Sequence, residues 1–228
     1  KAFVTFIEKT PPVGKTFLCV DDPYIKKILR KLKTKNYCTY GFHKKANYQI
    51  CNPKYRIGYT KFDLKIKNTG SKYFYINDIS LKLIGKYNVL NATAAIALCL
   101  SLGLKIKIIK QALKSFSGVQ RRLTKVFKQN KVEFYDDYAH HPTEIKSVLE
   151  AIKKVAPKRK IITIFQPHRY SRVRTLNSEF VSCFKDTDQI ILCPIYSAGE
   201  TVDKKYNNVK FAKLISKFSK VQVIIVKN

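Results

Sequence analysis

The sequence predicts an α/β fold in two parts, an antiparallel β patch with helices followed by a mostly parallel, doubly wound sheet. Between residues 48 and 83, apolar and polar residues alternate with a period of two, which is typical of strands with one buried face. After Ser117-Gly118, a plausible junction between domains, apolar strands alternate with helices, which is typical of a parallel sheet. The length of 228 residues suits one large domain or two small ones.

The first part is expected to contain short strands and four helices. In chain order we expect a helix end over Ala2–Lys9, a strand over Thr16–Val20, a helix over Tyr24–Leu32, strands over Tyr37–Phe42, Tyr48–Cys51, Lys61–Lys67, Lys72–Ile76 and Ser80–Leu83, and helices over Asn88–Leu102 and Lys107–Phe116. Pro11-Pro12 ends the first helix, and Pro23 begins the second. Turns at Asn68-Thr69-Gly70 and Asn77-Asp78 separate the last three strands. The Ala-rich helix is apolar nearly all round, which predicts burial, and Gly103 ends it.

The second part is expected to alternate strands and helices. In chain order we expect a strand over Val132–Tyr135, a helix over Thr143–Val155, a strand over Lys160–Phe165, a helix over Leu176–Phe184, a strand over Gln189–Cys193, a helix over Phe211–Phe218 and a strand over Val221–Val226. Glu144 lies in the first turn of its helix, where the helix dipole favours a carboxylate. The strand of residues 160–165 is so apolar that we expect it to be buried.

The net charge of +30, from 45 basic and 15 acidic residues, invites a nucleic-acid-binding interpretation. The lysines, however, are spread along nearly every helix and loop, and the sequence has no arginine-rich arm, glycine-rich RNA-binding signature or C2H2 spacing. We therefore expect no nucleic acid as partner, although anionic substrates would gain association rate from this charge.

Cysteine usage and the apolar segments favour a cytoplasmic protein. The six cysteines show no C-x-x-C pairing, so we expect reduced thiols. The longest apolar run, near residues 92–104, is too short to span a bilayer, and we find no signal peptide and expect no membrane association. Methionine is absent and the chain opens on Lys1, so we expect that the natural N-terminus is missing and that the chain is a fragment.

Polar segments follow three expected strands, at the edge where open α/β sheets bind ligands. They are Asp136–Glu144, Gln166–Arg172 and the residues Tyr196, Ser197 and Glu200. Three of the four histidines lie in the first two segments: His140, His141 and His168. Such convergence of His, Asp, Arg and Tyr indicates a functional site, and the alternative is a set of helix caps and surface ion pairs.

Two arginines and two weaker patterns complete the list of candidates. Arg169 and Arg172 are three residues apart, so at a helix start they face one side, where two guanidinium groups suit a carboxylate or phosphate. The histidines lack H-x-x-x-H and H-E-x-x-H spacings, so we expect no metal ligands among them. Gly14-Lys15-Thr16 is similar to the end of a phosphate-binding loop, but Lys9 stands where the first glycine is required. We interpret that segment as a turn.

Five segments together resemble the Mur ligase family, and within it the branch that adds L-alanine to UDP-N-acetylmuramate. In order, they are Gly85-Lys86-Tyr87-Asn88-Val89-Leu90-Asn91-Ala92, Phe116-Ser117-Gly118-Val119-Gln120-Arg121-Arg122, Asp136-Asp137-Tyr138-Ala139-His140-His141-Pro142-Thr143-Glu144, Phe165-Gln166-Pro167-His168-Arg169-Tyr170-Ser171-Arg172 and Tyr196-Ser197-Ala198-Gly199-Glu200. The third and fourth are specific to this branch and to its close relative that recycles murein tripeptide.

The resemblance implies which part of a three-domain ligase is present. Residues 1–117 look like the C-terminal part of the central, ATP-binding domain. Residues 118–228 look like most of the Rossmann-like C-terminal domain, which receives the amino acid. The UDP-sugar domain, the phosphate-binding loop and a closing Gly-Ala-Gly-Asp segment after Val226 are not seen. We therefore expect this chain alone to be inactive.

The resemblance also implies the chemistry and its cofactors. ATP phosphorylates the carboxylate of UDP-N-acetylmuramate, and the amine of L-alanine then attacks the acyl phosphate and forms an amide. Mg²⁺ assists, with its ligands expected outside this chain. Alternatives are the murein tripeptide ligase, which shares the His-His-Pro segment, and a basic nucleic-acid-binding module.

The resemblance carries over roles to ten residues. It implies adenine contacts for Asn88 and Asn91, phosphate contacts for Arg121 or Arg122, and ribose contacts for Asp136 or Asp137. It implies substrate contacts for Tyr138, His140, Arg169 and Arg172, of which the last three are the candidate catalytic residues. No general-base role is assigned to His140, because its pKa cannot be read from sequence. Tyr87 departs from the family, which usually has His there, so the geometry of the adenine pocket is in doubt.

Overall fold

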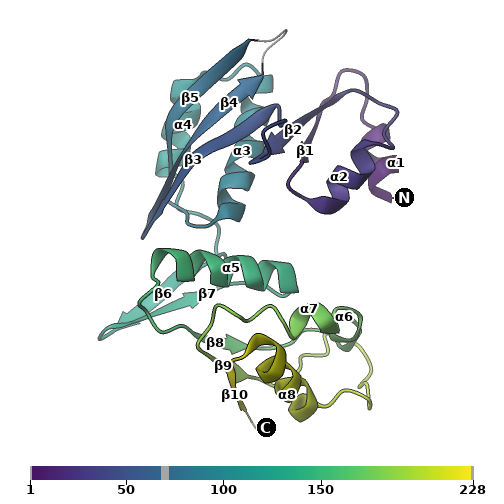
Figure 1. The fold of residues 1–228 in the computed structure, drawn as a ribbon, viewed down its shortest axis with the longest axis vertical. Coiled ribbons are helices and arrows are strands. Elements are labelled where there is room, and N and C mark those ends of the chain that lie inside the picture. Colours follow the sequence, from purple (N-terminus) through teal and green to yellow (C-terminus); the bar gives the residue numbers. More distant parts are fainter. Residues whose placement is uncertain (1, 68–71, 227–228) are drawn as a thin grey trace. The chain divides into compact units, whose positions relative to one another are not determined.

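The computed structural model describes residues 2–67 and 72–226, which divide into two compact units, Lys1–Ser117 and Gly118–Asn228. The division falls where the rhythm of the sequence changes from antiparallel strands to alternating strands and helices. Each unit has its own hydrophobic core, so each is described by itself. Figure 1 shows the order of the elements along the chain.

The first unit is a five-stranded sheet with helices. Its elements are α1 (Ala2–Glu8), β1 (Thr16–Cys19), α2 (Pro23–Leu29), β2 (Tyr37–Gly41), β3 (Tyr48–Arg56), β4 (Tyr59–Lys67), β5 (Tyr73–Leu81), α3 (Lys86–Ser101) and α4 (Ile106–Ser115). The strand order is β1-β2-β3-β4-β5, with parallel pairs from β1 to β3 and antiparallel pairs from β3 to β5. Figure 1 shows α3 and α4 on one face of the antiparallel strands. The predicted antiparallel patch is therefore confirmed.

One expected turn in this patch is wrong. The sequence predicts two strands separated by a turn at Asn77-Asp78, but β5 runs unbroken through both residues. The register between β4 and β5 shifts at this point, and Asp78 adopts a positive φ of 53°. The carboxylate of Asp63 accepts a hydrogen bond from the Asp78 amide at 2.8 Å, so the polar pair forms a bulge instead of ending the strand. The turn expected at Asn68-Thr69-Gly70 lies outside the described residues.

Helix α3 is buried on one face only, although its sequence is apolar nearly all round and predicts burial; Ala95 and Leu98 are exposed. Its buried residues lie on the side that packs against the sheet: Val89, Ala92, Thr93, Ile96 and Ala97. Val89, Ala92 and Ile96 belong to one buried cluster with Phe62 and Leu64 of β4, which are almost completely inaccessible to solvent. Gly85 precedes the helix with a φ of 97°, and Gly103 follows it with a φ of 80°, values that favour glycine at both ends.

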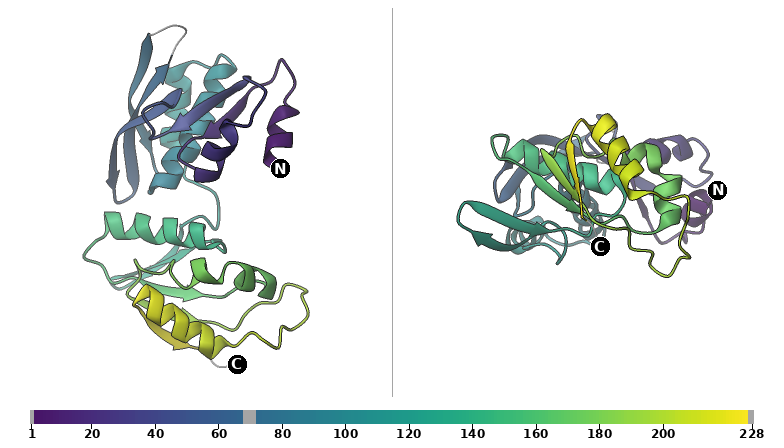
Figure 2. Two further views of the ribbon diagram at one scale, coloured as in Figure 1. Left: turned by 45° about the vertical axis from the view of Figure 1, so that its right-hand side comes forward. Right: turned by 90° about the horizontal axis from the view of Figure 1, so that it is seen from below.

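The second unit contains a hairpin and a three-stranded parallel sheet. Its elements are β6 (Thr124–Gln129), β7 (Val132–Asp136), α5 (Pro142–Val155), β8 (Ile162–Phe165), α6 (Tyr170–Thr175), α7 (Asn177–Phe180), β9 (Gln189–Leu192), α8 (Asn208–Ser219) and β10 (Gln222–Ile225). The parallel sheet has the order β10-β9-β8, and β6 pairs with β7 alone. The second view in Figure 2 shows this unit from below, with the hairpin separate from the three parallel strands.

The expectation that the strand after residue 131 joins the parallel sheet is wrong. β7 pairs antiparallel with β6, a strand that the sequence does not predict because its residues are mostly polar. Asn130 has a positive φ of 53° in the two-residue turn between them, the conformation that tight hairpins require. The stacked rings of Phe127 and Phe134, with centroids 4.0 Å apart, add a cross-strand contact. A central strand would have buried residues, but no residue of β7 is buried.

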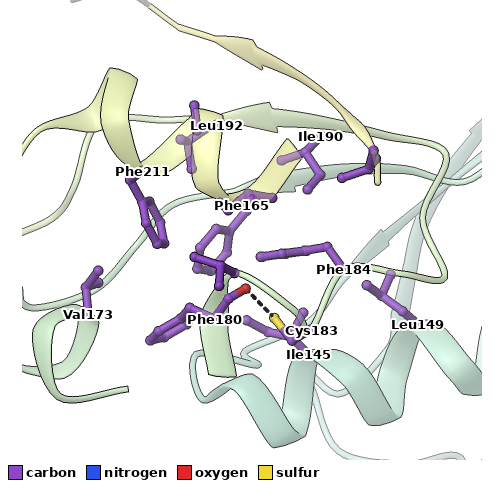
Figure 3. Close-up of a cluster of buried hydrophobic side chains, with 14 of the residues drawn as sticks. Ile145, Leu149, Phe165, Val173, Phe180, Cys183, Phe184, Ile190, Leu192 and Phe211 are labelled. Atoms are coloured by element: carbon purple, nitrogen blue, oxygen red, sulfur yellow. Dashed lines mark hydrogen bonds between the residues drawn. The ribbon is translucent and has the colours of Figure 1, made fainter. Parts of the chain in front are cut away.

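The parallel sheet is covered on one face. Phe165, Ile190 and Leu192 face a core to which α5, α6, α7 and α8 all contribute, and Figure 3 shows this cluster. On the other face, Ile162 is 52% exposed and Ile164 67% exposed. The doubly wound arrangement and the burial expected for this strand are therefore not found among the described residues. The strand is apolar on both sides, but only alternate residues reach the core.

The cysteines are reduced, and the described helices are shorter than a membrane-spanning helix usually is. All six cysteines are free, and Cys183 is buried, where its thiol donates to the carbonyl of Phe180, as drawn in Figure 3. Burial raises the pKa of the Cys183 thiol to about 12. Within residues 2–67 and 72–226, no helix combines the length and apolar character needed to cross a membrane.

Candidate functional site

The loops after β7, β8 and β9 bring four aromatic side chains of the second unit together. The ring centroids are 5.1 Å apart for Tyr138 and His140, 6.1 Å for His140 and His168, and 5.3 Å for His168 and Tyr196. Although β7 is not part of the parallel sheet, the polar segment that follows it still meets the segment that follows β8. This continuous row of rings defines the candidate site.

Helix α5 begins with a capping box that uses two residues of the first segment. The ring of His141 accepts a hydrogen bond from the amide of Thr143 at 3.3 Å. The carboxylate of Glu144 accepts hydrogen bonds from the amides of His140 and His141 at 3.1 and 3.2 Å. Partial burial raises the pKa of Glu144, but these amide bonds outweigh it and the pKa is lower than usual. His141 and Glu144 are thus committed to the helix start.

The ring of His140 is held by a contact with the backbone of the same segment. Its Nδ1 lies 2.8 Å from the carbonyl oxygen of Tyr138. Because a carbonyl only accepts, Nδ1 must carry the proton, and Nε2 of the neutral ring is left as an acceptor. The carboxylate of Glu144 lies 3.9 Å from Nδ1.

Asp137 ties the segment to the residues before β6. Its two carboxylate oxygens accept hydrogen bonds of 2.7 Å from the amides of Leu123 and Ala139. The amide of Tyr138 in turn donates to the carbonyl of Arg121 at 2.7 Å. Burial raises the pKa of Asp137, against the effect of these bonds. Asp137 therefore holds two backbone stretches together.

Arg121 and Arg122 form exposed ion pairs at the rim of this segment. Nε of Arg121 lies 3.5 Å from Asp136, and its guanidinium lies 4.6 Å from the ring centre of Tyr138. Arg122 lies 3.5 Å from Glu144. Surface pairs of this kind contribute only about 0–1 kcal/mol, so either arginine could exchange its partner for an anionic ligand.

The second segment centres on a bond between His168 and Arg172. Nη1 of Arg172 lies 3.1 Å from Nδ1 of His168 and 3.4 Å from its carbonyl oxygen. Because a guanidinium only donates, Nδ1 accepts, and the proton of the neutral ring is on Nε2. Burial lowers the pKa of His168, and the charges of Arg172 and Arg169 lower it further. His168 was not assigned a role from sequence, although the i,i+4 spacing to Arg172 could have indicated this contact.

Arg169 presents its side chain to solvent from an unusual backbone position. It precedes α6 with a φ of 69°, a conformation that is uncommon for residues other than glycine. Among the residues that the structure describes, its guanidinium forms no hydrogen bond or salt bridge. The Arg169–Arg172 pair therefore offers one uncommitted guanidinium beside one that is bonded to His168.

The two asparagines expected to contact adenine lie on α3 of the first unit. Asn88 is half-buried and its side-chain amide donates to the carbonyl of Ile84 at 2.8 Å. Asn91, one turn later, is exposed. Residues three apart on a helix share a face, so both amides lie on the same side of α3.

The described residues contain no cluster of side chains that would bind a metal. Over the described ranges 2–67 and 72–226, no three or more His, Cys, Asp or Glu side chains gather as a metal-binding group would require.

Comparison with known proteins identifies the family. The family model of the Mur ligase middle domain matches residues 1–99, and that of the Mur ligase glutamate ligase domain matches residues 121–227. The UDP-N-acetylmuramate–L-alanine ligase of Pelagibacter ubique is 48% identical over 228 residues, covering 99% of this chain and 49% of that protein. The enzyme of the same name from Agrobacterium fabrum is 41% identical over 201 residues, 87% of this chain and 42% of that protein.

Solved structures agree on the fold. The UDP-N-acetylmuramate-alanine ligase of Thermotoga maritima matches with a TM-score of 0.66 and 23% identity, covering 99% of this chain and 53% of that one. A murein peptide ligase from Psychrobacter arcticus matches with a TM-score of 0.65 and 19% identity, covering 99% and 46%. The chain spans about half the length of the curated relatives it matches. With both of its units matched by models of one family, the chain belongs to the Mur ligase family.

Proposed function

We propose that this chain is the ATP- and amino-acid-binding part of a cytoplasmic ligase that joins L-alanine to UDP-N-acetylmuramate in peptidoglycan precursor synthesis. The observation that carries the proposal is the 48% identity, along 99% of the chain, to a relative of that name. Residues 1–117 would supply the C-terminal part of the ATP-binding domain, and residues 118–228 the domain that receives the amino acid.

Nucleotide contacts are proposed for residues of each unit taken by itself. Asn88 and Asn91 offer side-chain amides, which suit the donor and acceptor edge of adenine. Arg121 or Arg122 would exchange its exposed carboxylate partner for the phosphates. For the ribose hydroxyls we favour Asp136 over Asp137, because both oxygens of Asp137 already hold backbone amides.

The acceptor and the reacting carboxylate would meet at the row of rings. Arg169 and Arg172 would bind the carboxylate of L-alanine, since guanidinium groups pair with carboxylates in two-point contacts. Tyr138 would close one side of the site. His140 would present Nε2, the ring nitrogen that its bond to the Tyr138 carbonyl leaves unprotonated, to the reacting groups.

The reaction follows from the chemistry of these groups. The muramoyl carboxylate attacks the γ-phosphorus of ATP, which gives an acyl phosphate and releases ADP. The amine of L-alanine then adds to the acyl carbon, phosphate leaves with the bonding electrons, and the amine loses a proton as the amide forms. The protein chiefly orients the reactants and stabilises developing charge. Mg²⁺, when bound, would neutralise phosphate charge, and its ligands would lie outside this chain.

A graft tests the proposal. Residues 118–228 form a compact unit with its own core, so they can replace the C-terminal domain of a matching L-alanine ligase. We expect phosphate release that depends on ATP, UDP-N-acetylmuramate and L-alanine, and competition by L-alanine but not by murein tripeptide. A folded chimera without this activity contradicts the proposal, and a preference for tripeptide would reassign the substrate.

A further inference from the structure

Helix α6 begins without a capping side chain at the position just before its first residue. The residue at the cap position is Arg169, whose side chain makes no capping hydrogen bond. The first amides of a helix have no partner within it, so they need an acceptor from elsewhere. Serine, threonine, asparagine or aspartate usually supplies that acceptor from the cap position itself.

Glu200 supplies the missing acceptor from a distant part of the chain. One of its carboxylate oxygens accepts from the amide of Ser171 at 3.0 Å, and the other accepts from the Ser171 hydroxyl. The bonds from Ser171 lower the pKa of Glu200, with further contributions from the amide of Tyr170 and the charge of Arg169. A residue 29 positions along the chain therefore caps α6.

Backbone hydrogen bonds in the loop after β9 fix the position of this carboxylate. The Arg169 amide donates to the Tyr196 carbonyl, and the Tyr196 amide donates to the Pro167 carbonyl, both at 2.8 Å. These bonds pair His168 with Tyr196 in a short parallel bridge beyond the ends of β8 and β9. The chain then turns through Ala198 and Gly199, with φ values of 52° and 85°, and places Glu200 over α6.

We propose that Glu200 is a positioning residue of the site, which caps α6 from the loop after β9 and thereby holds Arg169 and Arg172 toward the acceptor. Because the cap comes from another loop, the cap position can be occupied by an arginine whose side chain is free for a ligand. The identification of the acceptor as L-alanine rests on the proposed function, whereas the positioning itself does not.

His168 provides a reporter for this positioning. The charges of Arg172 and Arg169 lower its pKa, whereas the charge of Glu200 raises it. Removing the Glu200 charge alone would therefore lower the pKa of His168 further. Releasing the two arginines would raise it. The sign of the change distinguishes a positioning role from a simple charge effect.

The experiment measures this pKa in the 228-residue chain with ¹³C-labelled histidine, of which there are four. We expect Glu200→Ala to raise the pKa of His168 and to accelerate amide exchange at Tyr170 and Ser171. Ser171→Ala removes one bond to Glu200 without changing charge, so any rise in the pKa there reports release alone. As a matched control, Glu150→Ala removes an exposed carboxylate that pairs with Lys146 on α5 and should change neither quantity. An unchanged or lower His168 pKa in both test variants, with unchanged exchange, overturns the inference.

The functional consequence is measured in the grafted ligase. Glu200→Ala should raise the KM for L-alanine roughly 10- to 100-fold, the cost of a modest misplacement, and leave the KM for ATP unchanged. An equal effect on both KM values, or none, contradicts positioning of the acceptor. If the wild-type graft is inactive, the proposed function fails, and the pKa and exchange measurements still decide the role of Glu200.

Discussion

Replacing Arg172 by methionine tests the half of the arginine pair that the structure holds most firmly. The guanidinium is half-buried and donates to His168 at 3.1 Å, so its orientation is fixed before any ligand binds. In the proposed complex Arg172 also pairs with the carboxylate of L-alanine, and removing one partner of a buried, hydrogen-bonded charge pair costs about 2–5 kcal/mol. Because Arg172 is only half-buried and Arg169 remains, we expect the lower end, about 2–3 kcal/mol, or a loss of roughly 30- to 150-fold in kcat/KM for L-alanine.

The assay is initial-rate phosphate release by the grafted ligase, with Arg174→Met as control. Arg174 lies on the same helix, but its side chain is 69% exposed and pairs with Asp203 at 3.0 Å. A surface pair of this kind is worth about 0–1 kcal/mol, so the control should be almost as active as the wild type. Arg172→Met should also raise the pKa of His168, which loses a positive neighbour. Equal kcat/KM values for the two variants, or a His168 pKa that does not move, would refute the assignment.

Three further predictions concern stability. Asp137→Ala removes two 2.7 Å bonds and should accelerate exchange of the Leu123 and Ala139 amides, at a cost of about 1–3 kcal/mol; unchanged exchange would contradict its role. Phe184→Ala empties a fully buried position beside Phe165 and should cost about 3–5 kcal/mol in urea unfolding followed by amide signals of β9, so a cost below about 1 kcal/mol would argue against this core. His168 has a folded pKa below the 6.5 of the unfolded chain, so it contributes stability above pH 6.5 that is lost as pH falls through the folded pKa. His168→Asn should therefore lose less stability than the wild type between pH 7 and pH 5, and identical losses would count against it.

Local signals in the sequence were sufficient to predict most helices and strands. The apolar stretch that became α3 and the acidic first turn of α5 both follow from residues close together in the chain. The break expected at Asn77-Asp78 failed because it depends on Asp63, a residue of the neighbouring strand. Without that carboxylate in place, a polar pair between two apolar runs does indicate a turn.

The strand pairing of β7 could not be read in the same way. An apolar alternation such as Val132–Asp136 is compatible with a place in a parallel sheet or in a hairpin, because periodicity reports burial and not the partner. The partner strand, β6, contains two lysines and lacks the apolar alternation that predicts a strand. One of these lysines, Lys125, pairs with Glu133 across the hairpin at 2.7 Å. The sequence did predict that the loops after β7 and β8 meet, and the structure places the rings of His140 and His168 next to each other.

Within the candidate site, the polar residues separate into two groups that residue types alone do not distinguish. Asp137, Glu144 and Glu200 accept hydrogen bonds from backbone amides: Glu144 and Glu200 at the start of a helix, and Asp137 between two loops. Arg169 keeps its guanidinium uncommitted, and His140 keeps Nε2 as an acceptor. The helix-cap interpretation therefore holds for Glu144 and Glu200, whereas ligand contacts by Arg169 and His140 remain a prediction.

This separation has a consequence for how the site would tolerate change. A substitution in the second group removes one contact with a ligand and should leave the backbone in place. A substitution in the first group frees amides at a helix start or between two loops, which moves every side chain that those loops carry. Loss of Glu200 should therefore affect Arg169, Arg172 and His168 together, whereas loss of Arg169 should leave the bond between the other two intact. The pKa of His168 in Glu200→Ala, in Arg169→Met and in the variant with both changes measures that difference directly. If Arg169 acts on His168 only when the cap has placed it, the double variant should have the same His168 pKa as Glu200→Ala. Strictly additive shifts of the His168 pKa would show that the two residues act independently.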